Sequence, residues 1–212
     1  MATPKAIFYE NQAATIIKNL EKRNMEGYYC PDGASAVQTA LSLMPEHSVI
    51  SWGGSMTLNE TGLMEQLQKR DYTLIDRMTA STPEERRELY AKATLADYYL
   101  MSTNAITLDG QLVNIDGAGN RVACLIHGPE NVIILAGMNK VCPDVESAIR
   151  RVKNCATPPN TVRLNCKTPC AVTGICGDCL SPETICCQEV ITRYSRIKGR
   201  IKVILIGEEY GY

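Results

Sequence analysis

Apolar residues follow two spacings along the chain, one typical of amphipathic helices and one of short buried strands. Helical spacing is found over residues 6–22, 34–43 and 144–155. Apolar runs of strand length lie at 27–30, 48–52, 72–76, 132–137 and 201–206. Strands that alternate with helices predict an α/β fold, with a mostly parallel, layered sheet flanked by helices on both sides.

Local polar signals refine this arrangement. In Thr82-Pro83-Glu84-Glu85, Thr82 is a candidate N-cap, Pro83 suits the first helical position and Glu85 completes a capping box. This pattern predicts a helix that runs to about Ala96. Thr57 and Glu60 are spaced as in a capping box and predict a helix from Leu58 to about Arg70. Asp109-Gly110 lies between predicted strands over 98–106 and 112–115, so it indicates one inserted β-hairpin.

One segment departs from the regular pattern. Residues 158–187 are rich in Pro, Thr, Asn and Cys, show no periodicity, and are expected to form an irregular Cys-rich excursion before the last strand. No internal repeat or low-complexity linker divides the chain, and its 45% hydrophobic content is enough for a full core. We therefore expect residues 1–212 to form a single α/β domain.

Charge and composition exclude several partners. The formal net charge is −1, and the aromatic residues (one Trp, one Phe and ten Tyr) form no platform interleaved with basic residues, which argues against nucleic acid. Residues 1–11 lack the apolar core of a secretory signal, and no apolar run approaches the roughly 20 residues of a membrane span. We expect a cytoplasmic protein without a membrane span; a homo-oligomer is compatible with the sequence.

The first chemical feature joins a predicted strand to a predicted helix. It comprises Gly53, Gly54, Ser55 and Thr57. Glycines let the backbone approach a ligand, and amide and hydroxyl groups at a helix start can bind a phosphate or a carboxylate. The alternative is a tight turn in which Ser55 or Thr57 caps the helix. Glu60 is a candidate nucleophile or base, or else only a capping-box residue.

Further polar residues follow the later strands. The candidates for a site at the carboxyl edge of the sheet are Ser102, Thr103, Asn104, Asn114, Asp116, Gly117, Gly119, Asn120 and Arg121. Most of these are also common turn residues, but turn formation does not explain Arg121. Asn139 and Lys140 follow the strand at 132–137, where Lys140 supplies either a cation to the site or a solvated surface lysine.

Six of the ten cysteines lie in the irregular segment. They are Cys166, Cys170, Cys176, Cys179, Cys186 and Cys187. A reducing cytoplasm disfavours disulfides, and the pair Cys176-Gly177-Asp178-Cys179 can place two thiolates on one ion. Because the two histidines are distant in sequence, we expect an all-thiolate metal site, which suits either zinc or an iron-sulfur cluster. Free or redox-switching thiols are the alternative.

Four runs together resemble the lactate-utilisation (LUD-domain) family: 53–58, 102–117, 119–122 and 137–140. The resemblance extends over nearly the whole chain. It implies a fold like that of ribose-5-phosphate isomerase and CoA-transferases, in which ligands lie at the strand ends described above. It also implies a link to bacterial oxidation of lactate to pyruvate, in a system whose partner subunits carry iron-sulfur clusters.

Two classes of function follow. In the first, the chain is an enzyme or enzyme subunit, in a lactate-oxidising oxidoreductase system or with CoA-transferase or isomerase-like chemistry. Its ligand would be a small carboxylate, a phosphate or a CoA-type anion, and its catalytic candidates are Glu60, Asp116 and Lys140. In the second class, the chain is a non-catalytic regulatory or scaffold subunit that docks an iron-sulfur partner through its Cys-rich loop.

Overall fold

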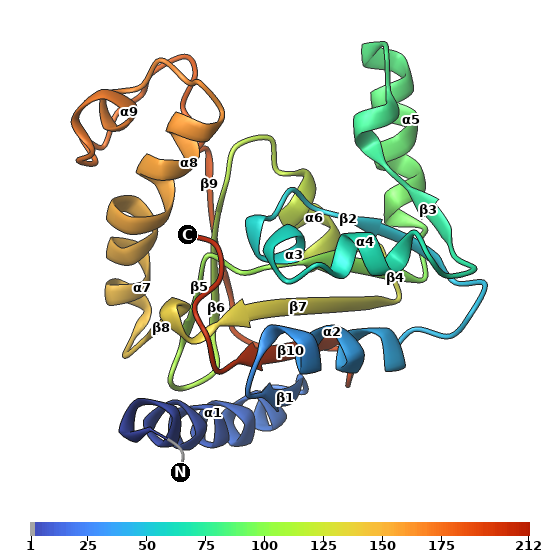
Figure 1. Ribbon diagram of the computed structural model, residues 1–212. Helices are drawn as coiled ribbons and strands as arrows, with labels where there is room; N and C mark the ends of the chain where they lie inside the picture. The colour runs from blue at the N-terminus through green and yellow to red at the C-terminus, as the bar shows by residue number, and fades with distance from the viewer. Residues whose placement is uncertain (1–2) are drawn as a thin grey trace.

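A parallel sheet of six strands forms the centre of the computed structural model, which describes residues 3–212 (Figure 1). The strands are β1 (Glu26–Cys30), β2 (Val49–Trp52), β3 (Thr73–Ile75), β4 (Tyr98–Met101), β7 (Asn131–Gly137) and β10 (Ile201–Ile206). Their spatial order is β1-β10-β7-β4-β2-β3, and every neighbouring pair is parallel. The predicted α/β class with a mostly parallel sheet is confirmed.

A smaller mixed sheet with the order β8-β5-β6-β9 lies beside the first. Its strands are β5 (Ala105–Thr107), β6 (Leu112–Asp116), β8 (Val141–Cys142) and β9 (Gln188–Thr192). β5 and β6 are antiparallel, which confirms the inserted hairpin. The single strand predicted over 98–106 is wrong, because the chain leaves the large sheet at Ser102 and enters the small sheet at Ala105. β9 was not predicted.

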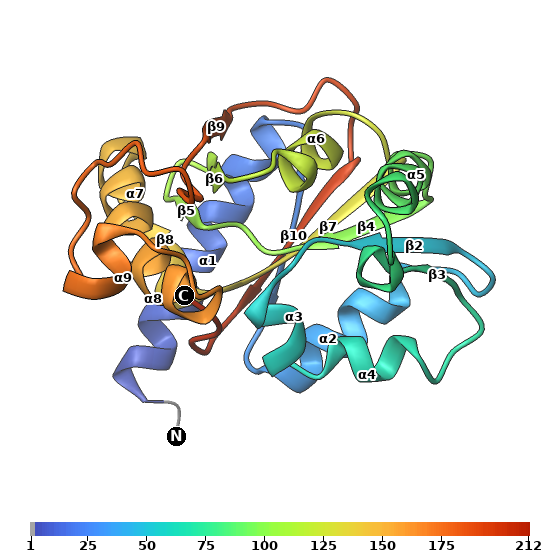
Figure 2. The same ribbon diagram turned by 90° about the horizontal axis from the view of Figure 1, so that it is seen from above.

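Helices cover both faces of the large sheet, as Figure 2 shows. One face packs against α1 (Pro4–Lys22), α5 (Pro83–Thr94) and α6 (Asn120–Ile126), and the other against α2 (Gly33–Ser42), α3 (Met56–Glu60) and α4 (Leu63–Leu67). The Thr3 hydroxyl caps α1 by accepting from the Ala6 amide at 3.2 Å, and Pro4 begins the helix. The capping box of Thr82 and Glu85 at the start of α5 is confirmed.

The helix predicted over 58–70 is instead two short helices. Gly62 lies between α3 and α4 with a φ of +77°, a left-handed conformation that interrupts the helix. Ser55, rather than Thr57, caps α3, because the Ser55 hydroxyl accepts from the Leu58 amide at 3.4 Å. The capping box of Thr57 and Glu60 is therefore wrong. Both side chains make other contacts, described with the site below.

A continuous helical run flanks the small sheet and contains a π-helical turn. It comprises α7 (Val145–Arg151), the π turn η3 (Val152–Ala156) and α8 (Thr157–Arg163). Pro158 and Pro159 have no amide hydrogen and cannot donate i→i−4 bonds, which accounts for the wider turn before them. The prediction that 158–187 is irregular throughout is wrong, since α8 and α9 (Pro169–Thr173) are helical; residues 174–187 contain no helix or strand.

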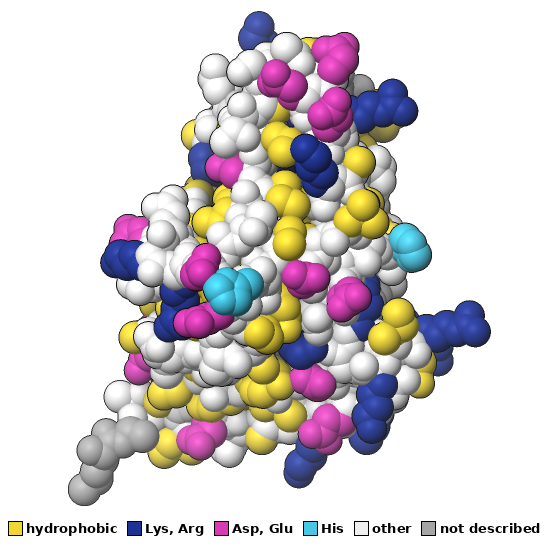
Figure 3. Space-filling model, turned by 90° about the vertical axis from the view of Figure 1, so that its right-hand side faces the viewer, with side chains coloured by type: hydrophobic (Ala, Val, Ile, Leu, Met, Phe, Trp, Pro, Cys, Tyr) yellow, Lys and Arg dark blue, Asp and Glu magenta, His cyan; other side chains and the backbone are white. Residues whose placement is uncertain are grey.

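The surface carries charges of both signs. Figure 3 shows one face on which Lys and Arg side chains are interspersed with Asp and Glu. Within residues 3–212, no helix combines the length and the apolar character needed to cross a bilayer.

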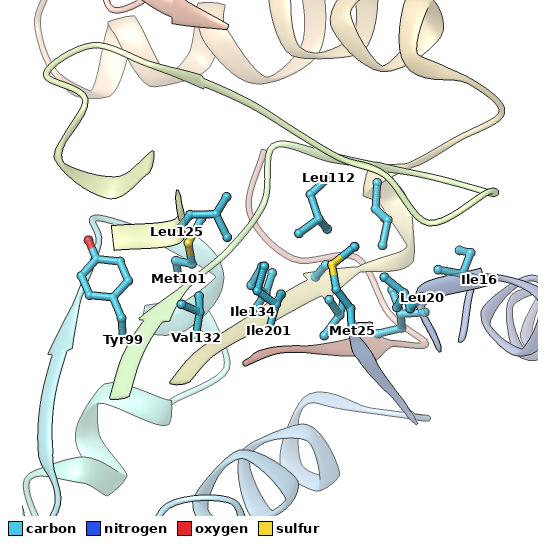
Figure 4. Close-up of a cluster of buried hydrophobic side chains, with 14 of the residues drawn as sticks. Ile16, Leu20, Met25, Tyr99, Met101, Leu112, Leu125, Val132, Ile134 and Ile201 are labelled. Carbon is cyan, nitrogen blue, oxygen red and sulfur yellow. The ribbon is translucent and has the colours of Figure 1, made fainter. Parts of the chain in front are cut away.

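The core on the α1 side of the large sheet is closely packed (Figure 4). Side chains from the sheet meet side chains from α1 and α6, and all of the following are at most 1% exposed: Ile16, Leu20, Leu125, Val132 and Ile134. Ile16 and Leu20 are four residues apart on one face of α1, which explains why this helix was predictable.

Arg200 is a buried cation that joins this core to a loop. Arg200 lies directly before β10. Its guanidinium donates to the carbonyls of Pro129 (2.9 Å), Leu125 (2.7 Å) and Cys124 (2.8 Å), and so caps the C-terminal end of α6. Removal of the Arg200 guanidinium would take this hydrogen-bond partner from all three carbonyls.

We expect Arg200→Met to lower the free energy of unfolding by about 3 kcal/mol. Urea denaturation of the variant and the wild type measures the change. Arg196→Met is the matched control, because Arg196 is exposed, and should change stability by no more than about 0.5 kcal/mol. Equal effects of the two substitutions would contradict the role of the Arg200 hydrogen bonds.

Candidate functional site

A polar cavity of about 280 Å³ lies at the carboxyl edge of the large sheet. Parallel strands place all their carboxyl ends at this edge, so loops that are distant in sequence meet there. Eleven of the sequence-predicted residues line it: Gly54, Ser55, Thr57, Ser102, Thr103, Asn104, Asp116, Gly117, Asn120, Arg121 and Lys140. The π turn η3 and helix α8 supply the opposite wall.

Lys140 is the buried cation of this cavity. It lies in the 3-10 turn η2 (Met138–Lys140) directly after β7, and only 4% of its surface is exposed. Its Nζ donates to the hydroxyls of Thr57 and Ser102, both at 3.0 Å, and so links the loops that follow β2 and β4. Burial lowers the pKa of Lys140 to about 7. The alternative of a solvated surface lysine is wrong.

Arg121 organises the other side of the cavity. It lies in the first turn of α6, and its guanidinium pairs with Asp116 at 3.2 Å and donates to the side-chain oxygen of Asn104 at 2.9 Å. It also donates to the Asn114 side chain and to the carbonyls of Ser102 and Ile115. Burial lowers the pKa of Arg121, and the Asp116 carboxylate opposes this shift. Arg121 therefore positions Asn104 and Asp116.

Asn114 lies behind this network rather than in the cavity wall. Its Oδ1 accepts from Arg121 and from the Asn104 amide, while Asn114 Nδ2 is buried without a hydrogen-bond partner among the described residues. Two predicted glycines are likewise outside the wall. Gly53 packs against the Arg121 side chain, and Gly119 is the N-cap of α6 with a φ of +81°.

Glu60 and Asn139 hold the segment at 210–212 in place. The Gly211 amide donates to Glu60 Oε2 at 2.6 Å, and Asn139 Nδ2 donates to the Gly211 carbonyl at 3.3 Å. The Thr57 hydroxyl donates to the Tyr210 carbonyl at 3.3 Å. Glu60 and Asn139 do not line the cavity, whereas Gly211 and Tyr212 do. The two side chains thus position the chain that closes this side of the site.

Sequence reasoning missed two cations of the cavity, Arg77 and Arg163. Arg77 lies in the short turn η1 (Arg77–Thr79) after β3, and Arg163 ends α8 in the segment expected to be irregular. Gly54 makes room for Arg77, because a Cβ at Gly54 would lie 2.9 Å from Arg77 Nη2. The position of Arg77 directly after a strand was the one available signal.

A second cavity of about 310 Å³ adjoins the first and shares Arg77, Ala118 and Asn120 with it. Its walls include the aromatic side chains of Trp52, Tyr90 and Tyr99. An anionic ligand in the polar cavity thus has an apolar space beside it.

The structure brings together four of the six clustered cysteines. Cys170, Cys176, Cys179 and Cys186 line a third cavity of about 240 Å³, whereas Cys166 and Cys187 lie outside it. In the part of the chain that the structure describes, no three His, Cys, Asp or Glu side chains are arranged as the ligands of a metal ion. Thr157 and Ile185 line both this cavity and the polar cavity.

Comparison with known proteins gives a family match and a match in fold. The family model described as the LUD domain matches residues 13–206. A crystal structure of a DUF162 family protein from Deinococcus radiodurans has a TM-score of 0.53 at 13% identity, and the match covers 93% of this chain and 98% of that chain. This likeness shows the fold alone. No curated protein matches the chain.

Two further solved structures are more distant. Ribose 5-phosphate isomerase A from Methanocaldococcus jannaschii has a TM-score of 0.34 at 14% identity, with 53% of this chain and 55% of that chain covered. The delta subunit of eIF2B from Chaetomium thermophilum has a TM-score of 0.35 at 15% identity, with 68% and 54% covered.

The lowered pKa of Lys140 predicts a pH dependence of stability. An unfolded chain holds this proton up to the ordinary pKa of 10.5, whereas the folded chain releases it at about 7. Above pH 7 the unfolded state therefore binds more protons, and stability rises with pH. Relative to Lys140→Met, the wild type should gain about 2 kcal/mol in the free energy of unfolding between pH 7 and 9.

Urea denaturation at pH 7, 8 and 9 measures this difference. Lys69→Met is the control, because Lys69 is exposed on the protein surface. Wild-type and Lys140→Met curves that stay parallel over this range would show that Lys140 keeps its charge.

Proposed function

The chain belongs to the LUD-domain family, and we propose that it is a subunit or accessory enzyme of bacterial lactate oxidation to pyruvate. In this proposal the polar cavity binds a small anion, either a carboxylate such as lactate or pyruvate, or the phosphate part of a CoA-type ligand. The Cys-rich segment binds a metal, and iron-sulfur partner subunits accept the electrons.

The observation that carries the anion site is the group of cations on one small cavity. Arg77, Lys140 and Arg163 all line it. Ser55, Ser102 and Thr103 line the same space, and the hydroxyls of Ser102 and Thr103 donate to backbone carbonyls. The Ser55 hydroxyl accepts from the Leu58 amide and keeps its own hydrogen, so a bound carboxylate or phosphate would meet this donor as well as the charges. Among the described residues, Asp116 is the one carboxylate of the wall, and Arg121 pairs with it. A surplus of positive charge therefore faces the ligand.

Lys140 is our candidate for proton exchange with the ligand. With a pKa of about 7, its amine can give or take a proton at neutral pH, which is the property that general acid-base catalysis requires. A 2-hydroxy acid held by Arg77 and Arg163 would place its hydroxyl within the same cavity. Asp116 is the second candidate in contact with this space, whereas Glu60 acts through the segment that it holds.

We expect the wild-type protein to bind pyruvate, L-lactate or inorganic phosphate in isothermal titration calorimetry. Lys140→Met and Arg77→Met should each weaken binding by about 10- to 100-fold, because each removes a charged hydrogen-bond donor. Ser55→Ala combined with Thr57→Ala should weaken binding without changing metal content.

Lys69→Met is again the control and should bind as the wild type does. Circular dichroism verifies that each variant is folded. The proposal is wrong if the wild type binds none of the three anions, or if Lys140→Met and Arg77→Met leave their affinity unchanged.

One observation favours the second class, a subunit that docks an iron-sulfur partner. Large apolar side chains are exposed around the Cys-rich segment: Val162, Leu164, Val172, Ile175 and Leu180. Leu180 is 98% exposed and lies between Cys179 and the turn at Pro182. Exposed apolar side chains gathered in one segment are typical of a protein interface.

This second function predicts a stable complex with the iron-sulfur subunits of a lactate-oxidising system when they are expressed together. Val172→Asp combined with Leu180→Asp should dissociate the complex, as measured by size-exclusion chromatography with light scattering. Ile197→Asp is the matched control, since Ile197 is an exposed apolar residue outside the Cys-rich segment. A complex that persists in the double variant would show that these exposed side chains are not the interface.

A further inference from the structure

We propose that Cys170, Cys176, Cys179 and Cys186 hold an iron-sulfur cluster that is separated from the polar cavity by one layer of residues. This inference deepens the metal site of the proposed function, on which it rests, by naming four ligands and the occupant. Cys166 and Cys187 are not ligands.

The four cysteines reach the cavity from three parts of the chain. Cys170 lies in α9, Cys176 and Cys179 lie in the irregular stretch that follows, and Cys186 lies just before β9. Two left-handed residues, Gly174 with a φ of +72° and Asp178 with a φ of +47°, turn this stretch back on itself. The ligand set is therefore gathered by loop geometry rather than by one helix.

Threonine hydroxyl groups lie near two of the four sulfur atoms. Thr168 Oγ1 lies 3.4 Å from Cys170 Sγ, and Thr157 Oγ1 lies 3.8 Å from Cys186 Sγ. Thr161 Oγ1 also lies 3.5 Å from Cys170 Sγ but donates its own hydrogen to the Pro158 carbonyl. When the cysteines are thiolates, Thr168 and Thr157 are thus available as donors. Hydrogen bonds to ligand sulfur stabilise its negative charge and adjust the reduction potential of a cluster.

The size of the space leaves room for a cluster as well as for a single zinc ion. Four thiolates close around zinc at about 2.3 Å each and leave no space between them. Here the four cysteines line a cavity of about 240 Å³, which has room for several iron and sulfide ions. Clusters of two or four irons both take four cysteine ligands. The all-cysteine donor set is what fits a cluster. Because no three of these side chains are yet gathered as metal ligands among the described residues, the irregular stretch must draw the four thiolates together when the cluster binds.

Two residues separate this cavity from the candidate ligand site. Thr157, at the start of α8, and Ile185 line both cavities. Cys187 strengthens the connection, because its amide donates to the Asp116 carbonyl at 3.0 Å. A cluster bound here would lie next to an anion in the polar cavity. It would also lie next to the exposed Leu180, which lines the same cavity as the four cysteines.

The test uses the full chain, reconstituted without oxygen with ferrous iron and sulfide. We expect equal amounts of iron and acid-labile sulfide, with two or four of each per chain, and an electron paramagnetic resonance signal after reduction with dithionite. Cys170→Ser, Cys176→Ser, Cys179→Ser and Cys186→Ser should each lose at least half of the bound iron. Cys166→Ser and Cys187→Ser, matched controls from the same segment, should retain it.

Several outcomes would overturn the inference. One zinc per chain without sulfide would show that the site is a structural zinc site. The absence of bound metal would show that the four thiols are free. Loss of iron in Cys166→Ser or Cys187→Ser would contradict the ligand assignment. Anion titration of the same samples distinguishes the two proposals, because a chain that binds pyruvate but no cluster refutes only the cluster. A change in the electron paramagnetic resonance signal when pyruvate is added would support the inference that the cluster and the anion lie on the two sides of one wall.

Discussion

The buried guanidinium of Arg121 is the interaction on which the site depends. A buried charge is stable only when its hydrogen bonds are satisfied, and Arg121 meets this requirement with Asp116, Asn104 and nearby carbonyls. Its partners lie on both sides of the hairpin of the small sheet, next to the point where the chain leaves β4. One side chain therefore links α6 to the hairpin of the small sheet and to the end of β4, beside the polar cavity that it lines.

The remaining walls follow from backbone chemistry. Parallel strands deliver Gly54, Ser102 and Lys140 to one edge of the large sheet. On the opposite side, two prolines impose a π turn within a helix, a feature that is frequent at functional sites. That helical run faces the polar cavity along one part and the cysteines along another, so two chemically different spaces share the wall at Thr157.

Much of this arrangement could be predicted from the sequence. Periodicity located the large sheet and α1, because Ile16 and Leu20 repeat on one face and the strands are nearly all apolar. Eleven predicted residues meet in one cavity because they follow strand ends. Arg77 and Arg163 were missed, since each lies in a short element without periodicity. The capping box at Thr57 and Glu60 was misread because tertiary contacts with Lys140 and Gly211 compete for these side chains.

The place of β10 in the sheet has a consequence for how the protein forms. In the described part of the chain, β1 pairs with β10 alone. Glu26 lies opposite Lys202, so the two partners are separated by most of the sequence. During synthesis, the edges of β1 and β7 that pair with β10 stay without a partner strand until β10 has left the ribosome. Pairing at such long range is slow, and open strand edges are prone to aggregate. Protection of nascent chains by chaperones is therefore expected to govern how much of this protein a cell obtains.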